Sequence, residues 1–370
     1  MAERTRRKRT ATAADFSARL LAWFDRHGRH DLPWQRERSP YRVWLSEIML
    51  QQTQVGTVIP YFERFVAAFP DVAALAAAPI DSVLHHWTGL GYYARARNLH
   101  RTARLLTAQY GGQFPAALDE LTALPGIGRS TAGAIAAIAF GRRAAILDGN
   151  VKRVLARHGA IAGWPGQADV ARVLWEIAER FTPTKRVADY TQAIMDLGAT
   201  LCTRTRPACA RCPVRADCRA HAAGVPEQYP GRKPKAATPI RTILFLILRN
   251  PAGAVLLEQR PPTGIWGGLW SFPECAPEAD IASRCDALGY RALGWQTGAA
   301  RRHVFSHYRL DYTPVEVTVA PDFAVADGDT RRWVLPASPD ALGLSAPVKA
   351  LLAELGDAPV APAKTVPRQP

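Results

Sequence analysis

The sequence has no long hydrophobic run. Its most hydrophobic stretch, ILFLIL at Ile243–Leu248, has the size of a strand, whereas a helix that crosses a bilayer needs about 20 apolar residues. The basic first residues, MAERTRRKRT, are not followed by the apolar segment of a secretory signal. We therefore expect no membrane association and a cytoplasmic location.

Acidic residues are in deficit. The chain has 32 Asp and Glu against 47 Lys and Arg, which gives a formal net charge of +15. Such an excess of positive charge favours a polyanionic partner. Charge alone leaves DNA, RNA and an anionic membrane surface open.

Two hydrophobic periods divide the chain. From residue 15 to about 201 the apolar residues recur with the period of a helix, and no strand pattern interrupts them. After a segment with four prolines the period becomes two, with a hairpin pattern at 242–260, strands within 302–319 and one helix near 278–288. We expect a disordered basic arm at 1–14, an all-α domain at 15–220, a linker at 221–240, an α+β domain at 241–356 and a disordered tail at 357–370.

A glycine turn joins two expected helices in the sequence LPGIGRSTAGAIAAIAF, residues 124–140. Helices at 116–124 and 130–140 flank the turn and form a helix–hairpin–helix. Gly126 and Gly128 allow backbone N–H groups at a helix N-terminus to approach an anion closely. An ordinary turn between two helices fits the same residues, and the net positive charge favours phosphate binding.

Four of the only six cysteines lie close together in an arginine-rich segment with the spacing C-x6-C-x2-C-x5-C. Without a secretory context, clustered cysteines indicate metal binding more often than disulfides. Four thiolates can hold zinc or an iron–sulfur cluster. Zinc ribbons have two close C-x2-C pairs, and the single pair here favours an iron–sulfur cluster. The four residues are Cys202, Cys209, Cys212 and Cys218.

Two carboxyl groups have contrasting sequence neighbours. Glu47 has mostly apolar helical neighbours, which would raise its pKa and suit a proton donor. Asp148 precedes a helix that begins near Asn150, where the helix N-terminus with Lys152 and Arg153 would keep it ionised. One protonated and one ionised carboxyl suit the cleavage of a glycosidic bond. A solvated Glu and a plain helix cap explain the same residues taken singly.

In combination these motifs resemble the MutY-type adenine DNA glycosylases of the helix–hairpin–helix DNA glycosylase superfamily. The likeness covers the chain apart from the basic arm and the tail, and the motifs occur in the family's order. They are LPWQ at 32–35, SEIMLQQTQV at 46–55, GLGYYARARNLH at 89–100, LPGIGRSTA at 124–132, LDGNVKRVLAR at 147–157, QAIMDLGATLC at 192–202 and the cysteine spacing.

The resemblance assigns roles to residues of this chain. It implies that Glu47 protonates the adenine after the base is flipped out of the duplex, that Asp148 stabilises an oxocarbenium-like sugar, and that Asn150 positions the water and the carboxylate. It further implies a 4Fe–4S cluster on the four cysteines. The remaining assignments are Trp34 and Gln192 in the adenine pocket, and Gln52, Tyr92, Gly126, Gly128 and Ser130 in contact with DNA.

Ser130 bears on the type of reaction. Superfamily members that also cut the DNA backbone, such as endonuclease III, carry a Lys at this point, and its amine forms a Schiff base with the sugar. A hydroxyl cannot do so. The sequence therefore predicts a monofunctional glycosylase, which releases the base and leaves the backbone intact.

The second domain resembles a MutT-like (Nudix-like) module without its metal ligands. The segment GIWGGLWSFPE at 264–274 is followed by a helix that lacks the paired glutamates needed for Mg²⁺. We expect binding rather than hydrolysis. By the resemblance, Phe305, Ser306 and His307 would detect 8-oxoguanine opposite the adenine.

The sequence thus predicts a monomeric, nucleoid-associated base-excision repair enzyme. Its partner would be double-stranded DNA with adenine mispaired with 8-oxoguanine or guanine. Two alternatives stay open: a pyrimidine-lesion glycosylase–lyase of the endonuclease III type, and a non-catalytic iron–sulfur DNA-binding protein.

Overall fold

The computed structural model describes residues 12–234, 238–305, 308–320, 330–339 and 341–357. Most of the expected basic arm and tail lies outside these residues, as do Ser306 and His307. The chain divides into two compact units, residues 1–77 with 98–235 and residues 78–97 with 236–370. Within the described ranges, no helix combines the length and the apolar character needed to cross a membrane.

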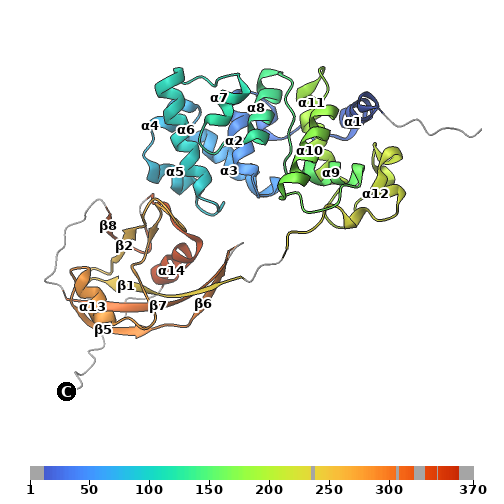
Figure 1. The fold of residues 1–370 in the computed structure, drawn as a ribbon. Coiled ribbons are helices and arrows are strands. Elements are labelled where there is room, and N and C mark those ends of the chain that lie inside the picture. Colours follow the sequence, from blue (N-terminus) through green and yellow to red (C-terminus); the bar gives the residue numbers. More distant parts are fainter. Residues whose placement is uncertain (1–11, 235–237, 306–307, 321–329, 340, 358–370) are drawn as a thin grey trace, which may run out of the picture. The chain divides into compact units, whose positions relative to one another are not determined.

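The first unit is helical throughout, as the period of its apolar residues predicted (Figure 1). Its short helices after residue 208 lie in the cysteine segment and at the start of the expected linker. The elements are α1 (Ala13–His27), η1 (Pro33–Gln35), α2 (Pro40–Leu50), α3 (Val55–Ala68), α4 (Val72–Ala77), α6 (Ala94–Tyr110, whose first four residues belong to the second unit), α7 (Leu118–Ala123), α8 (Arg129–Phe140), α9 (Gly149–Gly159), α10 (Ala168–Phe181), α11 (Val187–Thr200), η2 (Cys209–Arg211), η3 (Arg215–Asp217), α12 (Arg219–Ala222) and η4 (Pro226–Gln228).

Polar side chains define where several of these helices begin. Thr12 and Asp15 form a reciprocal capping box at the start of α1. The Ser39 side chain accepts the Arg42 N–H at the start of α2, with Pro40 as its first residue. Asp148 caps α9 in the same manner. The helix that carries Glu47 and the helix that follows Asp148 are therefore both fixed at their N-termini.

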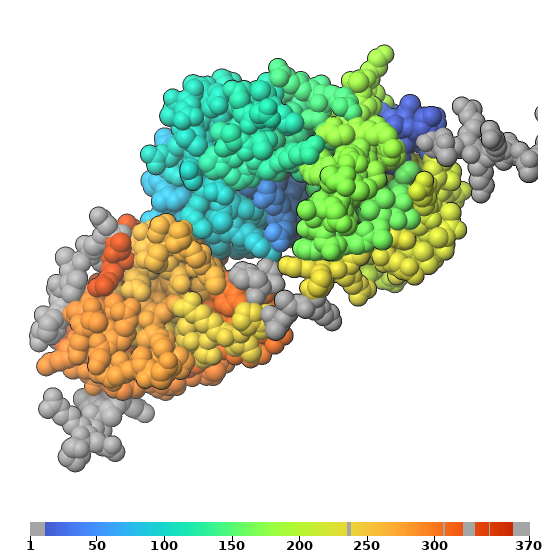
Figure 2. Space-filling view, viewed as in Figure 1, coloured from blue at the N-terminus to red at the C-terminus, as the bar shows by residue number. Residues whose placement is uncertain are grey.

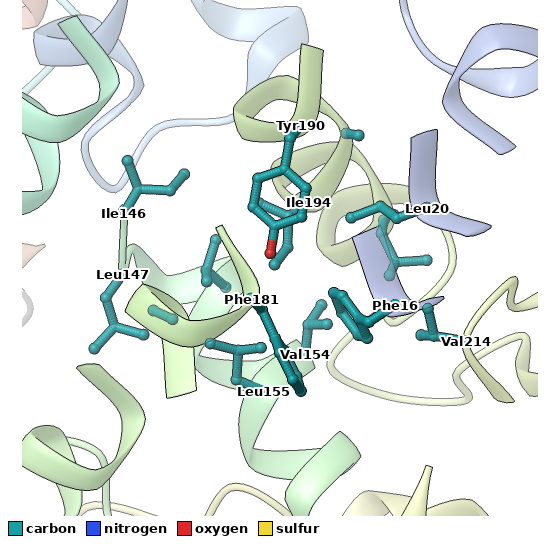
Figure 3. Packing of buried hydrophobic residues seen from close by; sticks show 14 of the residues in the cluster. Phe16, Leu20, Ile146, Leu147, Val154, Leu155, Phe181, Tyr190, Ile194 and Val214 are labelled. Atoms are coloured by element: carbon teal, nitrogen blue, oxygen red, sulfur yellow. The ribbon is translucent and has the colours of Figure 1, made fainter. Parts of the chain in front are cut away.

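The segment that leads to Asp148 is part of an apolar core (Figure 3). α11 packs against α1, α8 and α9, and the rings of Phe16 and Phe181 stack with centroids 4.4 Å apart. Ile146 and Leu147, which directly precede Asp148, are buried members of this core. Their burial anchors the backbone from which Asp148 projects.

The second unit is built on a mixed sheet. Its described strands are ordered β3–β2–β1–β7–β5, with β4 also paired to β1, β6 to β7 and β8 to β2. β1 runs parallel to β7, and the other pairings are antiparallel. The elements are α5 (Ile80–Trp87), β1 (Ile240–Arg249), β2 (Val255–Gln259), β3 (Trp270–Ser271), β4 (Glu274–Cys275), α13 (Ile281–Ala287), β5 (Ala292–Thr297), β6 (Arg301–Val304), β7 (Arg309–Val319), β8 (Arg331–Val334) and α14 (Ala346–Asp357).

The α+β class that the sequence predicted is confirmed, together with the β1–β2 hairpin and a helix near residues 281–287. The sequence analysis did not identify α14 or the parallel pairing of β1 with β7. That pairing explains the hydrophobic run at Ile243–Leu248, most of which is buried, because a strand in the middle of a covered sheet has both faces in the core.

Candidate active site

The two candidate carboxyl groups lie near each other within the first unit. Glu47 projects from the second half of α2, and Asp148 is the N-cap of α9. The Asp148 carboxylate accepts the backbone N–H of Val151 at 2.7 Å and the Asn150 side-chain amide at 3.3 Å. The predicted grouping of Glu47, Asp148 and Asn150 is therefore present in the fold.

The electrostatics of Glu47 and Asp148 favour a state in which one of the two carboxyl groups carries a proton and the other is ionised. Burial, and to a smaller extent the negative charge of Asp148, raises the pKa of Glu47 to about 8. Burial also raises the pKa of Asp148, while the Val151 N–H, Arg153 and Asn150 oppose the rise. Within the described part of the chain, donors that stabilise an anion are found at Asp148 and not at Glu47, which favours the proton on Glu47 and the negative charge on Asp148.

Three contacts hold the backbone on either side of Asp148. The Ser130 hydroxyl accepts the Leu147 N–H at 3.0 Å. This residue, expected to contact DNA, therefore supports residues 141–148, which join α8 to α9 and form the Asp148 loop. A Cβ on Gly133 would lie 2.3 Å from the Ala145 carbonyl oxygen, and one on Gly198 would lie 2.6 Å from Asn150 Cβ. The absence of a side chain at both glycines thus permits the close approach of α8 and α11 to this loop.

Gly133→Ala is expected to lower the free energy of unfolding by about 1–3 kcal/mol, because the new methyl group must displace backbone rather than a flexible side chain. Base release should fall more than the loss of folded protein accounts for, since the displaced segment carries Asp148. Gly56→Ala in α3 is the matched control, because its Cβ meets nothing within 4 Å. Chemical denaturation of both variants checks this, and equal stabilities would contradict the packing argument.

Arg153 connects this loop to the cysteine segment. Its guanidinium donates to Asn150 Oδ1 at 2.7 Å and to the Gly198 carbonyl at 2.8 Å, and its Nε donates to the Cys202 carbonyl at 2.7 Å. Because Arg153 binds the amide oxygen of Asn150, the amide nitrogen of Asn150 is left to face Asp148. Of the two basic residues expected to act on Asp148, Arg153 has this structural role.

The four clustered cysteines line one cavity beside α9 and α11, and each side chain is partly buried. Among the described residues, no three His, Cys, Asp or Glu side chains converge as ligands of a single metal ion. In a four-iron cluster each thiolate binds a separate iron, so the ligands stand further apart than those of one zinc ion. The four thiol side chains that line this cavity are the donor set that an iron–sulfur cluster or a zinc ion requires, so the residues present fit such a group.

A buried arginine organises the same segment. Arg157 is 2% exposed and donates to the carbonyl groups of Cys202, Thr203, Arg204 and Tyr229 over 2.7–3.3 Å, and also to Cys202 Sγ at 3.4 Å. Its charge would offset that of an anionic cluster. Arg153 and Arg157 both lie in the sequence LDGNVKRVLAR, where a spacing of four places them on one face of a helix. That spacing could have identified Arg153 and Arg157 as two arginines that act on the same neighbouring segment.

A second cavity brings Glu47 together with both residues of the predicted adenine pocket. Trp34 and Gln192 line it with Glu47, beside Gln35, Arg38, Val43, Ser46, Ile138 and Ala188. In the space-filling view, blue surface from the early part of the chain lies between the teal and the green helices of this unit (Figure 2). The open space admits about one water molecule, so a purine can enter only when side chains at the mouth move.

The predicted DNA contacts have unusual backbone geometry. Gln52 and Tyr92 have φ angles of 59° and 51°, in the left-handed region that L residues rarely adopt. Tyr92 is 45% exposed although it is a large aromatic side chain. Gly126 has a φ of 78°, and both Gly126 and Gly128 are exposed at the start of α8, where free backbone N–H groups can meet a phosphate.

In the second unit, Phe305 belongs to an aromatic cluster. Its ring stacks on Tyr308 with centroids 4.3 Å apart and packs against His303 at 4.7 Å and Trp266 at 5.1 Å. Trp266 itself has a φ of 55°. The cluster fixes the base of the segment that includes Ser306 and His307, which lie outside the described residues.

Comparisons with known proteins define the class. The sequence profile described as "HhH-GPD superfamily base excision DNA repair protein" matches residues 45–180, and that of the NUDIX domain matches residues 244–354. A thermostable thymine-DNA glycosylase of known structure is similar with a TM-score of 0.52 at 28% identity, over 57% of this chain and 97% of that chain. The first unit thus has the fold of a helix–hairpin–helix DNA glycosylase.

Curated relatives define the family within that class. Adenine DNA glycosylase of Buchnera aphidicola subsp. Baizongia pistaciae is 35% identical over 93% of this chain and 97% of its own length. The mouse adenine DNA glycosylase is 36% identical over 88% of this chain and 74% of its own. The chain belongs to the adenine DNA glycosylase family, whose members hydrolyse N-glycosyl bonds in DNA.

Proposed function

We propose that the protein hydrolyses the bond between adenine and deoxyribose where adenine is mispaired with 8-oxoguanine or guanine, and that it leaves the backbone uncut. The observation that carries this proposal is the cavity shared by Trp34, Gln192 and an acid whose pKa is raised to about 8. A flipped adenine would lie there with a proton donor against its ring. The enzyme would act as a monomer on the DNA of the cytoplasm.

The chemistry follows from the two carboxyl groups. Glu47 gives a proton to a ring nitrogen of adenine, and the bond between N9 and C1′ breaks with its electrons passing to the base. The positive charge left on the sugar is stabilised by Asp148. The Asn150 amide, held by Arg153 and Asp148, positions the water that adds to C1′. As the new C1′–O bond forms, the water gives up a proton to the carboxylate left on Glu47, which restores the acid. Ser130 has no amine, so no Schiff base forms at that point.

The four cysteines would hold a 4Fe–4S cluster that shapes the arginine-rich loop from residue 202 to residue 218. Arg204, Arg206, Arg211 and Arg215 in this loop carry positive charge that would contact phosphates. Together with the N-terminus of α8 and the side chain of Gln52, the loop would grip the duplex while the base leaves the stack. Tyr92, which belongs to the second unit, is a further proposed DNA contact.

The protein's function is tested by incubating it with duplexes that carry adenine opposite 8-oxoguanine, guanine or thymine, and by assaying the free base and the backbone separately. Adenine released from the first two duplexes without strand cleavage supports the proposal. A further duplex that carries a damaged pyrimidine is assayed in the same way, and release of that base with strand cleavage would support an endonuclease III type of activity instead. Tight binding without any base release would indicate a non-catalytic DNA-binding protein.

Recognition of the lesion is assigned to the second unit. Adenine is a normal base, so the opposite base must report the error, and Phe305, Ser306 and His307 would sense 8-oxoguanine there. Replacing Ser306 and His307 together by Ala should reduce the preference for 8-oxoguanine over guanine several-fold, because each recognition hydrogen bond contributes on the order of 1 kcal/mol. Single-turnover rates on the two duplexes measure this ratio. An unchanged ratio would remove the sensing role from this segment.

A further inference from the structure

The carboxylate of Asp196 is the most completely enclosed polar group beside the adenine pocket. Asp196 lies on α11 with 0% exposure. Its Oδ2 accepts the backbone N–H of Arg29 at 2.8 Å. Its Oδ1 accepts Nε of Arg29 at 2.9 Å, Nη2 of Arg29 at 2.5 Å and Nε2 of Gln192 at 2.8 Å. The carboxylate thus accepts four hydrogen bonds, three from Arg29 and one from Gln192.

This arrangement decides which way the Gln192 amide faces. An amide side chain has a donating end and an accepting end, and its orientation follows from its hydrogen-bond partners. Beside a carboxylate that is paired with an arginine, only the NH2 end of Gln192 can be accommodated, because two oxygen acceptors would repel each other. Gln192 Oε1 therefore faces away from Asp196, and none of the described residues donates a hydrogen bond to it.

The free end of the amide belongs to the pocket. Gln192 lines the same cavity as Trp34 and Glu47 and is 8% exposed. The cavity wall therefore presents a hydrogen-bond acceptor from Gln192. Among purines, such an acceptor favours a 6-amino group, which donates, over a 6-oxo group, which accepts.

We propose that Asp196, held by Arg29, is a positioning residue that fixes the polarity of the Gln192 amide and so selects purines with an amino group at C6. Asp196 touches neither the base nor the sugar and acts only through Gln192. The inference rests on the proposed function, since it needs the flipped base in this cavity. The proposal also explains why 6-oxopurines would be rejected. The oxygen at C6 of such a base would face Gln192 Oε1, and neither atom could donate a hydrogen bond to the other.

Asp196→Asn tests this with almost no change of shape. The Asn amide must turn its NH2 either toward the Arg29 backbone N–H or toward the Arg29 guanidinium and Gln192, so in both arrangements it meets a donor of Arg29. In both arrangements the negative charge that holds the NH2 end of Gln192 is lost, so the Gln192 amide is free to turn its NH2 end into the cavity. Three duplexes are compared, with adenine, hypoxanthine or the unsubstituted purine lacking any group at C6, each opposite 8-oxoguanine. Ratios of single-turnover rates are used because they do not depend on the fraction of folded protein.

In the variant, the rate ratio of adenine to unsubstituted purine should fall about tenfold, and the ratio of hypoxanthine to adenine should rise. Asp25→Asn is the matched control, since Asp25 also accepts two bonds from an arginine, Arg186, but lies at the surface; its ratios should equal those of the wild type. Equal losses on all three bases, or no change, overturn the inference alone. A wild-type protein that releases no adenine overturns the proposed function as well.

Discussion

Glu47→Gln is expected to abolish adenine release while duplex binding stays nearly intact. The amide has the shape of the acid but cannot give a proton to the leaving base, and this proton is needed only in the transition state. A positioned general acid contributes about 10²–10⁴-fold, so a loss of about a thousandfold in the single-turnover rate is expected. Rates on an adenine–8-oxoguanine duplex and a binding titration on the same duplex separate the two effects.

Glu63→Gln in α3 is the control for this substitution, because Glu63 is an exposed residue of the same type outside both cavities. It should have the rate of the wild type. A Glu47→Gln rate within about tenfold of the wild type, which corresponds to roughly 1.4 kcal/mol in the barrier, would show that another group supplies the proton.

The raised pKa of Glu47 also sets the expected pH profile. The protonated form is the active one, and burial with the nearby Asp148 raises its pKa to about 8. The rate of base release should therefore be retained through neutral pH and fall about tenfold per pH unit above 8. The residual activity of Glu47→Gln should lack this alkaline limb. An alkaline limb retained in the variant would assign it to a different group.

The sequence predicted the elements of this fold better than their partners. The helical and strand periods of the apolar residues predicted the all-α class of the first domain and the α+β class of the second, because periodicity reflects which side of an element is buried. Periodicity does not report which strands pair, so the parallel register of β1 on β7 could not be read from it. The glycine turn and the cysteine spacing were visible because few local structures need those residues at those distances.

The supporting residues of the site were harder to predict than its reactive residues. Glu47 and Asp148 were identified from their neighbours and from the family's motifs. Asp196 and Arg29 are 167 positions apart and meet only in the folded chain, and nothing in the local sequence of either shows that they do. Burial in the tertiary structure raises the pKa of Asp148, and the position of Asp148 before a helix could not show how deeply it is buried.

Loss of one of the four clustered cysteines should affect the protein more broadly than loss of the Glu47 carboxyl group. Cys212→Ser is expected to remove most of the bound iron and the brown colour, and to weaken duplex binding by at least about tenfold. The cavity that the four cysteines line would lose the group that joins them, and the arginines of residues 204–215 would lose their fixed positions. Iron analysis, visible absorbance, thermal unfolding and binding at two salt concentrations measure these effects.

Cys275→Ser provides the control, since Cys275 is a partly buried cysteine of the second unit that does not line this cavity. It should keep its iron and its affinity for DNA. Arg153 and Arg157 predict a further difference between the variants. Both hydrogen-bond to Cys202, and Arg153 also holds Asn150, so disorder in residues 202–218 should reach the Asp148 loop. Cys212→Ser should therefore lose base release even at DNA concentrations that restore binding. A colourless wild-type protein with stoichiometric zinc and full activity would contradict the iron–sulfur assignment.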